Sequence, residues 1–384
     1  MMPVYYLINV VALALACVTA AVYNASSFRT ARFTKDPPPP QHIRQSLIFN
    51  TPDAALEVIQ SDETDVFSLE HAAQTLEHDG VVWKTPKFST ISRIRNAHIT
   101  TDGLVSNATD IYTFGKWYWR QASAKHVRMS RPTHVENRAF LSLVQIYNEF
   151  FQHIVFDTLP KVAFACRFMQ YRPDITVLVM SNLHRDLVAE CCHMDNSRFM
   201  ILKSALHATD IFVPHFVGQD LQMGMIPANS MKTLGSQNAT GSRVVYVARK
   251  AGTIRSISNE ASVLAALREI FPGLVVMFPT NNWRRDRGVF AEASIIIGPH
   301  GGGMANMIFA PVNTTIIEFL PLRTLKRQGA NSRPCYFGLA RGLGFRYFSV
   351  EPEGFSFDKT MNLSIRMLTD TVHAAQLALE LANQ

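Results

Sequence analysis

A glycine-rich turn between an apolar strand and a helical segment is the part of this sequence best suited to hold an anion. Residues 294–297 read Ser-Ile-Ile-Ile, which is typical of a short buried strand, and residues 304–309 have helical character. Glycines let the backbone approach a ligand closely, and the free N–H groups at a helix start point toward it. A phosphate site is therefore predicted at Gly298, His300, Gly301, Gly302, Gly303 and Asn306, with a purely structural glycine turn as the alternative.

Two arginines and a glutamate stand at or just after the ends of other expected strands. Arg249 follows a strand at residues 244–248, and Arg255 comes six residues later. Guanidinium groups bind phosphate oxygens through paired hydrogen bonds, so both are expected at the phosphate, with a surface arginine as the alternative for each. Glu318 closes a strand and is expected to accept hydrogen bonds from ribose hydroxyls, as acidic residues do in dinucleotide sites.

A histidine and an aspartate are spaced for acid–base chemistry. His153 and Asp157 lie four residues apart in a helical segment, so both side chains share one helix face. A carboxylate that orients an imidazole is a general-base arrangement, and the spacing leaves open which of the two residues takes the proton. A polar surface pair or a helix-capping interaction is the alternative.

Some familiar motifs are missing from the chain. The glycine turn matches neither GxGxxG nor the P-loop pattern, and no DxD sequence that would place a divalent metal on a diphosphate occurs. We therefore predict a site without metal or cofactor, in which arginines and backbone N–H groups stabilise a leaving phosphate. A lipase-like hydrolase also uses an HGGG turn, but it needs a downstream GxSxG elbow that this chain lacks.

The elements that must position these residues alternate between strands and helices, which predicts an α/β fold with parallel sheets. Residues 218–241 are rich in Gly, Asn, Ser and Gln and mark a domain boundary. We expect an N-terminal α/β domain at 43–225, a nucleotide-binding α/β domain at 240–350, and a final segment at 351–384 that ends in a helix. Short strand-like runs fill residues 43–145. The expected later strands are 175–180, 199–202, 211–213, 244–248, 274–278, 295–297, 315–319 and 345–350, and the expected helices are 150–170, 182–192, 259–271 and 285–292.

The N-terminal region has the pattern of a membrane anchor. Residues 5–23 contain no charged side chain and are long enough to cross a bilayer, after a short tail at residues 1–4. A cleaved signal peptide is the alternative, because Val18-Thr19-Ala20 is an acceptable cleavage site. Residues 24–42 include the run of prolines at 37–40 and are expected to form a stem.

Sequons and cysteines favour a secretory-pathway lumen for the rest of the chain. Five Asn-X-Ser/Thr sequons are present, at Asn24, Asn107, Asn238, Asn313 and Asn362. One or two disulfides could form in such a lumen among Cys166, Cys191, Cys192 and Cys335, and buried free thiols are an equal alternative. The 384 residues carry a formal net charge of +7 and no Lys/Arg run of the nucleic-acid type, which suits a nucleotide or a membrane surface and not nucleic acid.

Three sequence blocks together resemble glycosyltransferase family 61, the group that contains plant β-1,2-xylosyltransferase. The blocks are His153-X3-Asp157-X2-Pro160, then residues 244–249 (Val-Val-Tyr-Val-Ala-Arg) with Arg255 and Asn259-Glu260, then residues 298–318 from Gly-Pro-His-Gly-Gly-Gly to Ile-Glu. This chain has Gly302 where the family commonly has alanine, Met304 where it has leucine, and Phe150 where it often has asparagine, with Asn148 displaced by two positions.

The resemblance implies an inverting transferase of GT-B architecture, with two Rossmann-like domains facing a central cleft behind a type II membrane anchor. It implies transfer of a xylose, arabinose or N-acetylglucosamine class of sugar from a UDP-sugar to a glycan or glycoprotein hydroxyl in the ER or Golgi lumen. His153 or Asp157 would take the acceptor proton, while Arg249, Arg255, His300 and the 301–303 amides would hold the leaving phosphate. An inactive lumenal protein that binds glycans or nucleotides is the alternative.

Overall fold

The computed structural model describes most of the chain from residue 88 onward and short strands before it. The described residues are 32–34, 45–47, 56–60, 64–70, 75–78, 81–84, 88–107, 110–112, 134–145, 147–216, 234, 241–280, 282–320, 335–353 and 360–383. The expected tail and anchor at 1–23, the segment at 217–233, Asn24 and Asn238 lie outside them. Among the described residues, no helix is long and apolar enough to cross a membrane.

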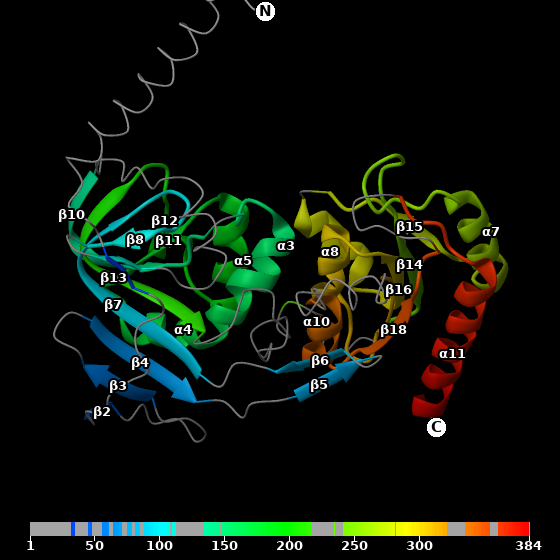
Figure 1. Ribbon diagram of the computed structural model, residues 1–384, viewed down its shortest axis with the longest axis horizontal. Coiled ribbons are helices and arrows are strands. Elements are labelled where there is room, and N and C mark those ends of the chain that lie inside the picture. The colour runs from blue at the N-terminus through cyan, green and yellow to red at the C-terminus, as the bar shows by residue number, and fades with distance from the viewer. Residues whose placement is uncertain are drawn as a thin grey trace, which may run out of the picture.

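A large mixed sheet forms the N-terminal half of the molecule (Figure 1). Its strands are β1 (Arg32–Thr34), β2 (Gln45–Leu47), β3 (Leu56–Gln60), β4 (Thr64–Glu70), β7 (Phe88–Ile99), β8 (Val105–Ser106), β9 (Asp110–Tyr112), β10 (His134–Ser142), β11 (Thr176–Val179), β12 (Phe199–Ile201) and β13 (Leu206–Phe216). A separate hairpin joins β5 (Thr75–His78) to β6 (Val81–Lys84). β1 lies in the segment expected to be a stem and pairs with β9.

The sheet mixes parallel and antiparallel pairs, and β1 and β9 at one end run parallel. β13, β10, β11 and β12 run parallel as predicted, but β7 pairs antiparallel with β13, β4 and β8. The expectation of a Rossmann-like N-terminal half is therefore wrong for its first strands. A parallel pair needs a crossover connection of a dozen or more residues, and the short links that join β3 to β4 and β7 to β8 cannot supply one.

The helical segment that follows β10 is interrupted by a π-helical turn. α3 (Phe151–His153) passes into the π-helix η1 (Ile154–Thr158) and then into α4 (Leu159–Tyr171). Pro160 has no N–H, and in a regular α-helix its ring would meet the carbonyl group four residues earlier. The wider π turn just before Pro160 relieves that clash. Such turns are frequent at functional sites, and this one contains Asp157.

The C-terminal half is a five-stranded parallel sheet with the order β15-β14-β16-β17-β18. Its elements are β14 (Arg243–Val247), α7 (Glu260–Ile270), β15 (Val275–Met277), α8 (Trp283–Phe290), β16 (Ala293–Pro299), the 3-10 helix η3 (Gly302–Phe309), β17 (Thr315–Phe319), α10 (Cys335–Leu343), β18 (Arg346–Val350) and α11 (Ile365–Asn383). β15 is added on one side of β14, and the following strands are added on the other side, so the strand order switches between β14 and β16. In sheets of this order, ligands bind outside the carboxyl ends of the two strands at that point.

Successive strand residues of this sheet contribute to two different apolar cores. Tyr246, Ile295 and Ile297 pack with α7 and α11 on the outer face. Val245, Val247 and Ile296 pack with α8, η3 and α10 on the other face, as the strand period of two requires. That second core continues without interruption into η1, α4 and α5 (Asn182–Cys192) of the N-terminal half.

Charged and aromatic contacts join the two halves across this shared core. Arg284 pairs with Asp186 at 3.0 Å, and Arg287 pairs with Glu190. Both arginines lie on α8 and both carboxylates on α5. The rings of Phe151 and Phe309 lie 5.8 Å apart, so α3 also packs against η3.

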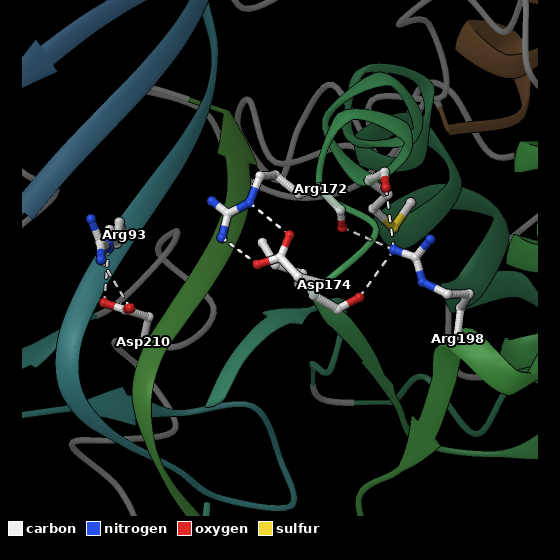
Figure 2. Close-up of polar contacts among 7 residues, drawn as sticks. Arg93, Arg172, Asp174, Arg198 and Asp210 are labelled. Atoms are coloured by element: carbon white, nitrogen blue, oxygen red, sulfur yellow. Dashed lines mark hydrogen bonds and ion pairs between the residues drawn. The ribbon is translucent and has the colours of Figure 1, made fainter. Parts of the chain in front are cut away.

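Polar contacts hold the C-terminal end of α4 in place. Arg198 Nη2 donates to the backbone carbonyls of Met169, Arg172 and Ile175 at 3.0–3.2 Å, which satisfies groups that a helix end leaves unpaired (Figure 2). Figure 2 also shows the ion pairs Arg93–Asp210 and Arg172–Asp174 beside it.

One disulfide is present among the described cysteine side chains. Cys166 of α4 bonds to Cys192 of α5. Cys191 is a buried free thiol, and burial raises its pKa to about 12. The disulfide fixes the position of α4 relative to α5, the helix that contacts the C-terminal half.

Candidate active site

Arg249 lies just beyond the carboxyl end of β14, where a ligand of such a sheet is expected. Its side chain is half-buried, and the buried Nε atom has no hydrogen-bond partner within the described part of the chain. Burial lowers the pKa of Arg249, and the nearby charge of Arg255 lowers it further. A buried donor atom without a partner is costly, and a second cation beside Arg249 makes an anionic ligand the natural complement.

Arg255, the second arginine of the pair, has a strained backbone conformation. Its φ is 63°, in the left-handed region that residues other than glycine seldom occupy. Such strain is concentrated at functional sites, where surrounding structure holds it in place. The loop between β14 and α7 therefore presents two guanidinium groups at the strand ends.

The glycine turn packs directly against Arg249. A Cβ atom at residue 301 would lie 1.9 Å from Nη1 of Arg249, and a Cβ atom at residue 298 would lie 2.9 Å from the backbone oxygen of Val247. At residue 298 the neighbour is backbone, so glycine is needed there, whereas at residue 301 a Cβ atom would instead displace the end of the Arg249 side chain. At Gly303 the corresponding neighbours are Pro279 and Val247, both at 2.8 Å.

Replacing Gly301 by alanine should displace the Arg249 guanidinium and weaken binding of the predicted phosphate ligand by about 10- to 100-fold, because a hydrogen bond to a charged group contributes about 1.5–3 kcal/mol. Isothermal titration with UDP would measure the change. Gly288→Ala on α8 is the matched control, since a Cβ there would meet no atom within 4 Å. Equal UDP affinity in both variants would contradict the close contact between Gly301 and Arg249.

His300 is held by a buried carboxylate behind the turn. Its Nδ1 lies 2.6 Å from Oε1 of Glu318, and Glu318 accepts a second hydrogen bond from the hydroxyl of Tyr347. Glu318 is 1% exposed, so both of its oxygens are used inside the protein. In this structure Glu318 positions His300. The ribose contact expected of Glu318 stays a prediction, and it would require the hydrogen bonds to His300 and Tyr347 to change.

Tyr336 of α10 closes the turn from the other side. Its hydroxyl donates to the backbone carbonyl of Gly301, and its ring lies edge-on to His300 at 5.1 Å. Asn306 is also buried, with its amide donating to the carbonyl of Gly303 at 3.1 Å, and its Oδ1 has no hydrogen-bond partner among the residues that the structure describes. Side-chain contacts therefore hold the turn from both sides.

His153 and Asp157 form the pair that their spacing predicts. His153 Nδ1 lies 2.8 Å from Oδ2 of Asp157. The aspartate side chain is 3% exposed and the histidine side chain 20%. A buried carboxylate that binds Nδ1–H leaves the other ring nitrogen, Nε2, to accept a proton, so the exposed member of the pair is the one arranged to meet a substrate.

A group of buried polar side chains lies behind this pair. Lys161 donates to Oε1 of Gln145, and Asn148 donates to the carbonyl of Leu143 at 3.0 Å and to the hydroxyl of Thr158 at 2.7 Å. Burial lowers the pKa of Lys161 from 10.5 to about 8, and the charge of Asp157 opposes that shift. Lys161 is therefore the cation placed to balance the buried Asp157 carboxylate.

The lowered pKa of Lys161 predicts a specific pH dependence of stability. Between about pH 8 and 10.5 the folded chain binds fewer protons at this residue than the unfolded chain does, so its contribution to the free energy of unfolding rises with pH. The rise amounts to about 3 kcal/mol across the window. In Lys161→Met this rise should be missing. The wild-type melting temperature minus that of the variant should therefore increase from pH 7.5 through 8.5 to 9.5. Parallel curves would mean that Lys161 titrates normally.

The helix that carries His153 touches the glycine turn across the two halves. Gln152 precedes His153, and its Oε1 would lie 2.6 Å from a Cβ atom on residue 302. Gly302, which replaces the alanine common in the resembled family, makes room for this glutamine. Phe156 and Tyr336 meet nearby with their rings 5.1 Å apart. The predicted proton acceptor and the predicted phosphate site therefore lie on segments that pack against each other.

Sequence reasoning named most of the residues found here and missed some. Arg249 follows the carboxyl end of β14, and the turn that contains His300 lies at the carboxyl end of β16, as expected. Arg255 lies in the loop after β14, and Asn306 lies in η3. The residues that support them were not predicted, because no local pattern distinguishes Gln152, Lys161, Tyr336 and Tyr347.

A comparison with protein families agrees with this geometry. The family model described as Glycosyltransferase 61 matches residues 151–317, a segment that contains the His153–Asp157 pair, both arginines and the glycine turn. No curated protein sequence matches the chain. The resemblance of residues 151–317 to glycosyltransferase family 61 is therefore confirmed.

Proposed function

We propose that this protein is an inverting glycosyltransferase that moves a sugar from a UDP-sugar to a hydroxyl of a glycan or glycoprotein. The match to a glycosyltransferase family supports transfer of a sugar. The observation that carries the donor assignment is Arg249, a half-buried cation with an unpartnered Nε beside a second arginine and a glycine turn. A diphosphate supplies the negative charge and the oxygen acceptors that such a site needs.

The reaction follows from the two groups of residues. The acceptor hydroxyl oxygen forms a bond to the anomeric carbon while the bond from that carbon to the diphosphate oxygen breaks. His153 Nε2 takes the hydroxyl proton, and Asp157 stabilises the resulting imidazolium. Arg249, Arg255 and the amides of the turn bind the departing diphosphate, whose charge increases as the bond breaks. We propose that these groups suffice without a metal ion.

His300 has a supporting role in this scheme. Its Nδ1 is held by Glu318, so Nε2 is the nitrogen that can face a ligand. With both nitrogens protonated, His300 donates a hydrogen bond to a phosphate oxygen while the Glu318 carboxylate balances its charge. Glu318 and Tyr347 are then positioning residues for this donor.

We also propose that the protein works in a secretory-pathway lumen, held by an anchor at residues 5–23. The Cys166–Cys192 disulfide supports this, because such bonds persist mainly in oxidising compartments. Two sequons, at Asn313 and Asn362, lie at exposed positions of the structure, where an oligosaccharide can be attached. Whether the anchor is retained or cleaved does not alter the chemistry.

Incubation of the full chain with a panel of UDP-, GDP- and CMP-sugars, with and without EDTA, tests this function. We expect UDP to raise the melting temperature by mass action, and one UDP-sugar to be hydrolysed slowly, in both conditions. Binding of UDP without transfer or hydrolysis of any sugar would favour the alternative of an inactive lumenal binding protein. No response to any nucleotide would remove the proposal.

A further inference from the structure

We propose that Tyr147 and Phe150 form an aromatic subsite that binds a sugar ring of the acceptor next to His153. This inference rests on the proposed function and specifies its acceptor class. It assigns the acceptor as a carbohydrate ring and not a peptide side chain. The two aromatic residues lie in the turn that precedes α3, outside the donor-binding strand ends.

Both rings are exposed and both flank the proposed base. Tyr147 is 38% exposed and Phe150 54% exposed, although large aromatic side chains gain free energy when they are buried. The ring centroid of Tyr147 lies 5.2 Å from that of His153, and the ring centroid of Phe150 lies 6.5 Å from it. An acceptor in contact with these two rings would have its hydroxyl groups beside the imidazole.

Neither the backbone conformation at Tyr147 nor helix capping at Phe150 favours the residue type found there. Tyr147 adopts a left-handed φ of 68°, which is unfavourable for a bulky side chain. Phe150 is the N-cap of α3 and makes no side-chain cap bond, although Ser, Thr, Asp and Asn are strongly preferred there. Two aromatics are thus kept where neither burial nor capping favours them, which points to a ligand.

The turn that carries the two rings is rigid. Phe150 N–H donates to the carbonyl of Tyr147 at 2.9 Å, and the buried side chain of Asn148 fixes the turn to Leu143 and Thr158. A preformed surface loses little conformational entropy when a ligand binds. Phe150 also stands where the family often has asparagine, so the subsite is a feature of this chain and not of the shared motif.

A sugar ring fits this surface better than a peptide hydroxyl does. A pyranose has a face of C–H groups that can cover an aromatic ring and a rim of hydroxyls that can reach His153. A serine or threonine side chain brings a hydroxyl but no such face. The arrangement therefore selects an acceptor by its ring as well as by its hydroxyl.

The test uses the full chain with its UDP-sugar and two kinds of acceptor. The first kind is a panel of methyl glycosides of xylose, mannose, galactose, glucose and N-acetylglucosamine, and the second is a peptide that contains serine and threonine. We expect transfer to one or more glycosides and not to the peptide. Phe150→Ala and Tyr147→Ala should each raise the acceptor KM by about tenfold, while UDP affinity and acceptor-free donor hydrolysis stay unchanged.

Two further variants separate this role from a structural one. Phe150→Tyr keeps an aromatic ring and should keep the wild-type acceptor KM. Tyr171→Ala is the matched control, because Tyr171 is an aromatic that is 53% exposed at the far end of α4, about 18 Å along the helix from its start. Unchanged acceptor KM in Phe150→Ala and Tyr147→Ala, or transfer to the peptide alone, would overturn the subsite.

Direct binding provides a readout that does not need turnover. Saturation-transfer NMR of the methyl glycosides in the presence of UDP should detect contact with the wild-type chain and lose it in Phe150→Ala. If UDP binds but no glycoside does, the subsite is refuted while the donor site stands. If UDP itself does not bind, the proposed function fails first, and a glycoside that still binds through Phe150 would show that the subsite exists independently.

Discussion

Arg249→Ala is expected to lower kcat/KM by about 10²- to 10³-fold and to abolish the UDP-induced rise in melting temperature. Loss of a single preorganised group that stabilises a developing negative charge commonly has an effect of this size. Arg249 should lie at the upper end, because its guanidinium is already half-buried and set against the glycine turn. Initial rates with a UDP-sugar, together with titration of UDP, give both quantities.

The control for this variant lies at the opposite end of the same strand. Arg243 begins β14 and pairs with Glu292 at 2.8 Å, with both side chains about half exposed. Exposed pairs of this kind contribute little, so Arg243→Ala should leave rate and UDP affinity unchanged. Arg249→Lys keeps the charge but loses the paired donors, and should recover only part of the affinity. Wild-type turnover and UDP affinity in Arg249→Ala would remove the phosphate assignment.

His153→Ala is expected to lower kcat by about 10²- to 10⁴-fold while UDP binding stays at the wild-type level, because general-base catalysis contributes that much to proton-transfer steps. Asp157→Asn should cause a loss of similar size, since an amide in place of the carboxylate can fix the imidazole in the wrong tautomer. The measurement is kcat at saturating donor and acceptor, with UDP affinity determined in parallel.

Asp174→Asn is the matched control for the aspartate. Asp174 lies beyond the end of α4, pairs with Arg172, and has a side chain that is 58% exposed. Its replacement should leave kcat unchanged. Full activity in both His153→Ala and Asp157→Asn would show that another group accepts the proton. A loss in His153→Ala alone would leave the imidazole as base and make the carboxylate dispensable.

The C-terminal half could be predicted closely from the sequence because its signals are local. Each strand is a short apolar run with a glycine, proline or charged residue at its end, and the strand expected at 315–319 is β17 without any change of bounds. The residues of the predicted anion site were equally accessible, since the glycines, the histidine and Arg249 stand directly at or after strand ends. Residues that act together and lie close together in the sequence form a local pattern that can be recognised.

The parts that could not be predicted depend on distant contacts. β7 has no clear alternation in its sequence, and its pairing with β13 joins residues more than a hundred positions apart. The bond between His300 and Glu318 had no local signature, and Glu318 looked like a ligand contact because it ends an apolar strand. Lys161 reads as a surface residue until the fold buries it beside Asp157.

The apolar core that runs from α4 and α5 into α8, η3 and α10 limits how this molecule can change over evolutionary time. A half borrowed from a relative would have to restore the packing of Phe151 on Phe309 and the pairing of Arg284 with Asp186 before it could fold beside its new neighbour. On the proposed function, acceptor and donor preference would therefore be inherited together, and new specificities would arise by replacement of single exposed residues around His153 and not by exchange of a whole half.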